Sequence, residues 1–221
     1  MNKPIFPLYA GYLFDLDGTL VDSAPDLHEA LNATLAFAGA DSVDESLTRH
    51  WVGHGSEMLI NEALRFQGRK EKASKEMVQF FLDDYHSHIA TNSKLYPGVE
   101  RVLDTLRTRG AKLAVVTNKY ENLAKAVLHE LNLNERIDVL VANETAPKPK
   151  PSADPALAAV KKLGLNIEDV LFIGDAPPDV GCARAAGCPI VCVSYGYNQG
   201  TNPKDLGADH VIDHLTDLLP A

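Results

Sequence analysis

The sequence has little cysteine and no long hydrophobic run. Its three cysteines, Cys182, Cys188 and Cys192, are odd in number and lack Cys-x-x-Cys spacing. This pattern excludes a disulfide framework, and we interpret the three as buried small side chains in a reducing compartment. Residues 1–7 contain one lysine and no continuous apolar run, so we expect neither a signal peptide nor a membrane anchor. We therefore expect cytoplasmic localisation and no membrane partner.

Positive charge is also scarce. Lysine and arginine number 21 against 30 acidic residues, which gives a formal net charge of -9. Nucleic acids and anionic membranes recruit clustered basic residues, so we expect no nucleic-acid partner. A small anionic substrate is compatible with this charge where the site supplies its own positive group. The length of 221 residues suits one large domain or a domain with an insertion, as a monomer or homodimer.

Short apolar runs alternate with helical patterns over most of the chain. Four runs predict buried parallel strands, and a fifth is weaker: 12–14, 113–116, 170–173, 190–193 and 137–141. Apolar residues at helical spacing lie between them, at 99–106, 123–131 and 157–163. This alternation predicts an α/β fold, with a Rossmann-like doubly wound parallel sheet and right-handed crossovers.

A region after the first strand breaks this alternation. Helical spacing predicts three helices there, near 23–38, 56–64 and 77–89. Ser23 is expected to cap the first helix, with Asp26 in its first turn. We therefore predict a small helical cap domain over residues 24–93, inserted into a core formed by residues 1–23 and 94–221.

Polar residues follow the predicted strands at the point where each strand ends. These residues are Asp15, Asp17, Thr117, Asn118, Lys150, Asp175 and Asp179. In open α/β sheets, ligands bind in the crevice beyond the carboxyl ends of the strands. Each motif alone is typical of a turn or a solvated surface charge. Their joint appearance after successive strands predicts one shared functional crevice.

The residue types in this crevice indicate phosphoryl chemistry. Four carboxylates without histidine or cysteine suit Mg²⁺ rather than zinc or copper, so Asp15, Asp17, Asp175 and Asp179 are candidate metal ligands. With a divalent cation bound, Lys150 would add positive charge for a phosphate group. Asp15 is suited to be a carboxylate nucleophile. Asp17 could protonate the leaving alcohol and later activate water.

These residues resemble the four motifs of the haloacid dehalogenase-like superfamily. The motifs are residues 15–23, Thr117-Asn118, Lys150-Pro151, and Gly174-Asp175 with Asp179. The resemblance implies that Asp15 attacks phosphorus and that Asp17 is the acid/base and binds the metal through its carbonyl. It also implies that Asp175 ligates Mg²⁺, while Asp179 orients a ligand or adds one. Aspartate at position 17 separates this chain from the metal-independent dehalogenase branch.

Two segments look most like bacterial phosphoglycolate phosphatases, namely residues 22–27 and Gly53-His54-Gly55. The second is similar to the cap loop that closes over the substrate. Flanking glycines would let that loop approach the crevice closely, although a helix-linking turn with an exposed His54 is an equal alternative. The expected substrate-binding residues are Thr117, Asn118, Lys150, Gly18 and His54. The leading substrate is 2-phosphoglycolate.

The chain also departs from the pattern that this resemblance implies. The third motif usually reads Lys-Pro-x-Pro, but here Lys150-Pro151 is followed by Ser-Ala, and Lys148-Pro149 competes with it just upstream. We prefer Lys150 because Asp154 then lies where the next helix should begin.

Three alternatives to a phosphoglycolate phosphatase stay open. One is a sugar phosphomutase similar to β-phosphoglucomutase, although residues 53–55 lack the lysine and arginine that grip a sugar. Another is a phosphatase for a different small phosphomonoester. A more remote one is a non-catalytic binding protein on the same scaffold, against which the intact aspartate set argues.

Overall fold

The strands expected from the sequence assemble into one six-stranded parallel sheet. The structure is a computed structural model that describes residues 6–219, and the strand order is β5-β4-β1-β6-β7-β8. The strands are Gly11–Phe14 (β1), Lys112–Val116 (β4), Val139–Val141 (β5), Val170–Gly174 (β6), Ile190–Val193 (β7) and His210–Ile212 (β8). β1 pairs with β4 on one side and β6 on the other, so these three strands end side by side.

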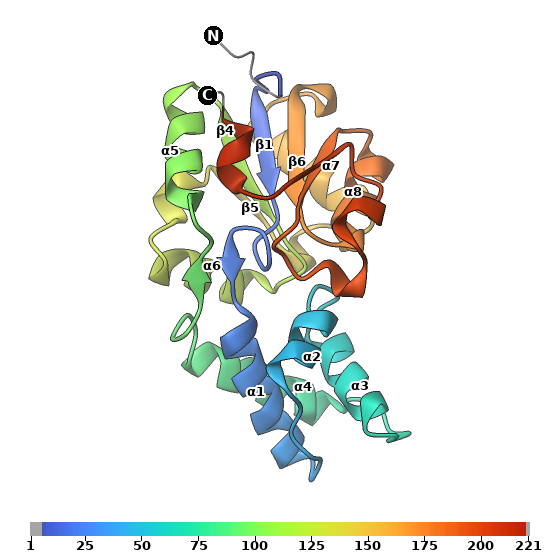
Figure 1. The fold of residues 1–221 in the computed structure, drawn as a ribbon. Coiled ribbons are helices and arrows are strands. Elements are labelled where there is room, and N and C mark those ends of the chain that lie inside the picture. The colour runs from blue at the N-terminus through green and yellow to red at the C-terminus, as the bar shows by residue number, and fades with distance from the viewer. Residues whose placement is uncertain (1–5, 220–221) are drawn as a thin grey trace.

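Helices cover both faces of the sheet (Figure 1). They are α5 (Val99–Thr108), α6 (Glu121–Glu130), α7 (Asp154–Leu163) and α8 (Pro177–Ala186). Tyr12 and Phe14 of β1 pack in a cluster with residues of α5 and α6, whereas Leu13 packs with residues of α7 and α8. Successive side chains of a strand point to opposite faces, so each strand contributes to two cores. The α/β doubly wound fold is confirmed.

Two elements of this core were not predicted. β8 is short, and its first residue, His210, is exposed, so no apolar run marks it. α8 begins with Pro177-Pro178 and contains Gly181, which obscures its helical pattern. Proline is nevertheless well suited to the first turn of a helix, because the N–H groups there have no partner within the helix. Short 3₁₀ helices complete the core: Asn134–Arg136 (η1), Asn143–Thr145 (η2), Ile167–Asp169 (η3), Asn198–Gly200 (η4), Pro203–Asp205 (η5) and Leu215–Leu218 (η6).

A helical lobe lies beyond the carboxyl end of β1 (Figure 1). It consists of α1 (Ala24–Phe37), α2 (Glu45–Trp51), α3 (Ser56–Phe66) and α4 (Lys75–Ser87). The helices share a core around Leu31, Phe81 and Tyr85. α2 was not predicted, while the other three match the expected helices. The boundaries between the helical lobe and the core, at residues 23/24 and 93/94, stay a prediction.

The two linkers between lobe and core pair with each other. β2 (Val21–Asp22) and β3 (Lys94–Leu95) form an antiparallel ladder, which the sequence did not reveal. Asp26 binds the second linker, because its carboxylate accepts hydrogen bonds from Asn92 N (2.8 Å), Ser93 N (2.9 Å) and the Ser93 hydroxyl. Ser23 occupies the N-cap position of α1 as predicted, but its side chain makes no capping bond and donates to Asp17 instead.

In the part of the chain that the structure describes, no helix is long and apolar enough to cross a membrane. Residues 1–5 of the N-terminal segment, for which we expected neither a signal peptide nor an anchor, lie outside the described residues.

Replacing Asp26 with Asn should lower the free energy of unfolding by about 1–3 kcal/mol, because an amide would place a donor against N–H groups that need an acceptor. Urea denaturation of the variant and the parent measures the difference. Glu29→Gln removes the same charge from an exposed site on α1 and should change stability by less than about 0.5 kcal/mol. Equal stability of Asp26→Asn and the parent would contradict this role for Asp26.

Candidate active site

The predicted site residues lie at the carboxyl ends of the three central strands. Asp15 follows β1, Thr117 follows β4 and Asp175 follows β6. Because β1 pairs in register with both neighbours, these residues emerge at one level of the sheet. The helical lobe covers this edge, and the enclosed pocket is bounded by both parts of the chain.

Three carboxylates meet in a buried cluster. One oxygen each of Asp15, Asp175 and Asp179 lies within 4.8 Å of the others, and the residues are 7%, 1% and 1% exposed. Lys150 enters from the loop before α7, and its Nζ lies 2.7 Å from Asp15 Oδ1 and 2.6 Å from Asp179 Oδ1. Lys148 is exposed, so the structure brings Lys150 to the cluster and leaves its competitor outside.

Asp179 and Asp175 are held by bonds to the surrounding backbone and side chains. Asp179 Oδ2 accepts from Asp175 N and Ala176 N, each at 3.1 Å, and so caps α8. Asp175 Oδ1 accepts from the Thr19 hydroxyl at 2.7 Å, and Oδ2 accepts from Tyr197 N at 2.9 Å. Asp179 thus uses both oxygens within the protein.

Gly18 is placed against this cluster. Its φ is +90°, and a Cβ at this position would collide with the Asp175 carboxylate. A residue with a side chain would be strained in that conformation and would also displace Asp175. The expected role of Gly18 in substrate binding stays a prediction, and what the structure shows is close backbone packing beside Asp175.

Asp17 lies apart from the three-carboxylate cluster. Its Oδ1 accepts from Lys119 Nζ at 3.0 Å and from the Ser23 hydroxyl. Lys119 was not among the predicted site residues, although it directly follows the Thr117-Asn118 motif. The signal was its position just past the end of β4, where a long side chain can reach back over the crevice.

Asn118 joins two loops. Its Oδ1 accepts from Lys150 N at 2.9 Å, and its Nδ2 lies 3.1 Å from Lys150 O and 3.2 Å from Gly53 O. The neighbouring Thr117 hydroxyl accepts from Lys119 N at 3.1 Å, which leaves its own proton free to donate. Asn118 therefore braces the Lys150 loop against the lobe in this structure, while Thr117 faces the pocket.

His54 lies on the loop before α3, and its side chain is exposed. Its Nδ1 is 2.9 Å from Gln199 Nε2, and Gln199 also donates to Val52 O at 2.9 Å. The ring lies in a shallow surface cavity rather than in the pocket beside Asp15. Contact of His54 with substrate stays a prediction. Gln199 was not predicted, since η4 carries no apolar or motif pattern.

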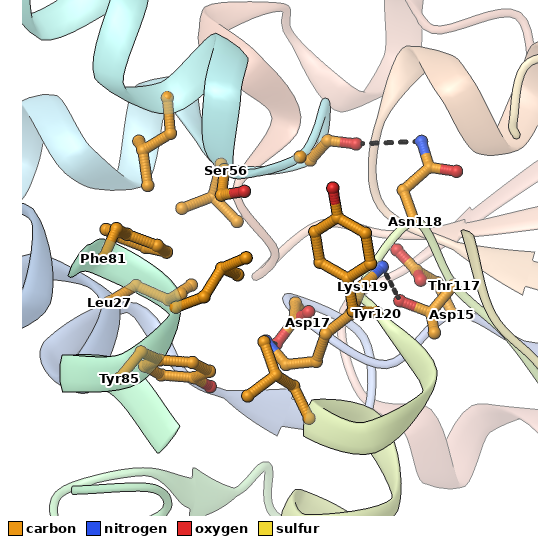
Figure 2. Close-up of a pocket in the computed structure, with 16 residues that line it drawn as sticks. Asp15, Asp17, Leu27, Ser56, Phe81, Tyr85, Thr117, Asn118, Lys119 and Tyr120 are labelled. Atoms are coloured by element: carbon orange, nitrogen blue, oxygen red, sulfur yellow. Dashed lines mark hydrogen bonds and ion pairs between the residues drawn. The ribbon is translucent and has the colours of Figure 1, made fainter. Parts of the chain in front are cut away.

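A pocket lies between the sheet and the lobe (Figure 2). Figure 2 shows Asp15, Asp17 and Thr117 on one side and the lobe residues Ser56, Phe81 and Tyr85 on the other. Its lining residues are Asp15, Asp17, Leu27, Val52, Gly53, Gly55, Ser56, Leu59, Phe81, Leu82, Tyr85, Thr117, Asn118, Lys119, Tyr120 and Leu123.

Comparison with known proteins assigns the family. The family model described as "Haloacid dehalogenase-like hydrolase" matches residues 12–193. The chain belongs to this family. A phosphoglycolate phosphatase of Yersinia pestis is 35% identical over 218 residues, covering 98% of this chain and 94% of that protein. One from Nitrosococcus oceani is 38% identical over 209 residues, covering 93% of each chain.

The fold comparison agrees with the family assignment. The crystal structure of a predicted phosphoglycolate phosphatase from Haemophilus somnus superposes with a TM-score of 0.86 at 29% identity, covering 96% of this chain and 97% of that one. Together with the curated relatives, this makes the chain a phosphoric monoester hydrolase of the haloacid dehalogenase-like family. Its substrate is a small phosphorylated compound.

The acidic cluster of this hydrolase is electrostatically strained. Burial, and then the neighbouring charge of Asp179, raise the pKa of Asp175 to about 7. Burial and Asp179 likewise raise the pKa of Asp15 well above its usual value, against the lowering effect of Lys150. Burial alone would lower the pKa of Lys150, but Asp15 and Asp179 outweigh it and raise that pKa. One ammonium group therefore faces three carboxylates.

The residues present fit a divalent cation. The donors are carboxylate oxygens, which are hard ligands. Asp15 Oδ1 is buried and is ion-paired with Lys150 Nζ at 2.7 Å. Hydrolases of this family generally use a divalent metal, and Asp15, Asp175 and Asp179 form the acidic cluster that suits one.

Lys150→Met should lower the free energy of unfolding in EDTA at pH 8 by about 3–5 kcal/mol, because two buried carboxylates lose their counterion. Urea denaturation measures the change. The loss should be smaller at about pH 5.5, where the high pKa values of Asp15 and Asp175 allow protons to replace the ammonium charge. Lys148→Met is the matched control and should stay within about 0.5 kcal/mol of the parent. A Lys150→Met variant as stable as this control would contradict the role of Lys150 as the counterion of the buried carboxylates.

Proposed function

We propose that this hydrolase is a Mg²⁺-dependent phosphatase that acts on 2-phosphoglycolate through an aspartyl-phosphate on Asp15. The proposal rests on one observation: a buried cluster at the carboxyl ends of the central strands contains Asp15, Asp175 and Lys150. Relatives named phosphoglycolate phosphatase along nearly the whole chain support the choice of substrate.

Asp15 and Asp175 would hold the magnesium ion through their carboxylates, together with the Asp17 carbonyl that the family resemblance implies. Bound there, the ion would neutralise charge on the phosphoryl oxygens. Asp179 would orient the site, a role that the family resemblance implies, through its bonds to Lys150 and to the backbone at the start of α8. Mg²⁺ suits this set because it prefers oxygen ligands and keeps several waters.

Phosphoryl transfer then follows from the positions of the chain's own groups. An Asp15 oxygen bonds to phosphorus as the bond from phosphorus to the substrate oxygen breaks, and Asp17 gives that oxygen a proton. Lys119 and Ser23 both bind Asp17 Oδ1, so Oδ2 is the oxygen left to exchange the proton. In the second step, Asp17 takes a proton from water, whose oxygen attacks phosphorus and releases phosphate from Asp15. Lys150 and the Thr117 hydroxyl position the phosphoryl group.

No observation favours the phosphomutase alternative. The loop at Gly53-His54-Gly55 presents no lysine or arginine to grip a sugar, and His54 turns toward Gln199. Assembly as a monomer or homodimer and a cytoplasmic location stay predictions from the sequence.

Asp15→Asn should abolish turnover, with a loss of about a thousandfold or more, because an amide oxygen is a poor nucleophile. The measurement is phosphate release from 2-phosphoglycolate with saturating MgCl₂. Folding should survive, since the variant removes one charge from a crowded buried cluster, and thermal unfolding checks this. Asp205→Asn, at an exposed site, is the control and should keep full activity. Substantial activity in Asp15→Asn would exclude the covalent mechanism.

Mg²⁺ should raise the melting temperature more at about pH 8 than at about pH 5.5. The pKa of Asp175 is about 7 when folded, against about 3.9 when unfolded. The stabilisation from its bound proton is therefore full below about pH 4 and is lost as the pH rises to about 7. The cation can replace that proton only where it has left. Thermal unfolding with and without MgCl₂ tests this, and equal shifts at both pH values would exclude the cluster as the binding site.

A further inference from the structure

The pocket contains one cation apart from the acidic cluster and its Lys150. Among its lining residues the charged ones are Asp15, Asp17 and Lys119, and the rest are apolar or neutral. Leucines, valine and aromatic rings form most of the wall on the lobe side. A second negative group on the substrate, beyond the phosphoryl group, would therefore have Lys119 as its counterion in this pocket.

Lys119 is held in place, but its ammonium group still has hydrogen-bond donors to offer. Its side chain is 5% exposed, its Nζ lies 3.0 Å from Asp17 Oδ1, and it sits 4.6 Å from the centre of the Tyr85 ring. An ammonium group has three donor protons, and Asp17 takes one of them.

Two hydroxyl groups of the lobe also have protons to donate. Tyr85 is 1% exposed; its hydroxyl faces the Lys119 ammonium, and no acceptor for its own proton lies among the described residues. The buried Ser56 hydroxyl has no hydrogen-bond partner in that part of the chain. Both residues line the pocket, on the lobe side in Figure 2, opposite Asp17. Buried polar groups usually have a hydrogen-bond partner, so these two hydroxyls are available to an acceptor in the pocket.

The start of α3 adds donors at the same wall. α3 is 11 residues long and begins at Ser56, and Gly55 before it has no side chain to cap the helix. The first N–H groups of a helix have no partner within the helix and favour a negative group. Gly53, Gly55 and Ser56 all line the pocket.

We propose that Lys119, Ser56, Tyr85 and the amino end of α3 form a second subsite, which binds a carboxylate of the substrate. The inference rests on the proposed function and names the class of its substrate: short phosphomonoesters that carry a carboxylate. The apolar walls lower the local dielectric constant, which strengthens the attraction between the carboxylate and Lys119. A neutral substrate of the same size would offer no acceptor to the remaining Lys119 protons or to the two hydroxyls, so it should be rejected.

The test compares 2-phosphoglycolate with ethyl phosphate, which has a methyl group in place of the carboxylate. The quantity measured is the ratio of the two kcat/KM values, in which an effect on Asp17 common to both substrates cancels. The parent should favour 2-phosphoglycolate by about a hundredfold or more. Lys119→Met should lower this ratio at least about tenfold, mainly because KM rises for the substrate that carries the carboxylate, and Lys119→Arg should restore part of it.

Three further variants complete the design. Tyr85→Phe keeps the ring over Lys119 and removes the hydroxyl, and Ser56→Ala removes the other hydroxyl. Each should lower the ratio by about twofold to tenfold, and together they test the subsite if Lys119→Met does not fold. Lys125→Met is the control, because Lys125 is exposed and pairs with Glu121 on the surface of α6, so the ratio should not change.

The outcomes separate the two proposals. A parent that hydrolyses both substrates equally well overturns the subsite, and so does an unchanged ratio in Lys119→Met or, if that variant does not fold, in the combined Tyr85→Phe and Ser56→Ala variant. A parent that hydrolyses no phosphomonoester in MgCl₂ overturns the proposed function and the subsite with it.

Discussion

The mutual repulsion of three buried carboxylates is the constraint on which the site depends. β1 and β6 pair in register, with Phe14 opposite Ile173, so the residues that follow them must emerge together. The fold compensates locally, through Lys150 and through the backbone donors that hold Asp175 and Asp179. The compensation is incomplete, as the raised pKa values of Asp15 and Asp175 show, and the acidic cluster that results suits a divalent cation.

The pocket exists because polar side chains of the core hold the lobe in place. Asn118 and Gln199 bind consecutive carbonyls of the lobe, at Gly53 and Val52. The Tyr197 hydroxyl accepts from Ser23 N and Ala24 N at the start of α1. All three side chains come from loops beyond the carboxyl ends of strands. The edge of the sheet that carries the chemistry therefore also fixes the position of the lobe that encloses it.

The features that could be predicted from the sequence are those marked by hydrophobic periodicity or by a local motif. Apolar runs located five of the six strands, and strand-end motifs placed Asp15, Asp175 and Lys150 in one crevice. The sequence did not predict contacts between residues far apart in the chain, such as Lys119 with Tyr85 or Gln199 with His54. Ser23 shows why: a serine before a helix normally caps it, and only the folded chain places the Asp17 carboxylate within its reach.

An acidic protein that binds an anion must do so at short range. With a net charge of -9, the chain's long-range field repels a phosphorylated acid instead of steering it inward. The attraction must come from buried groups, where the surrounding protein weakens screening. In the proposed function these groups are Lys150 and a divalent cation at the phosphoryl end, and Lys119 at the other end. Each lysine is already paired with an aspartate that the chemistry requires. Substrate recognition and the positioning of Asp15 and Asp17 thus use the same two ammonium groups.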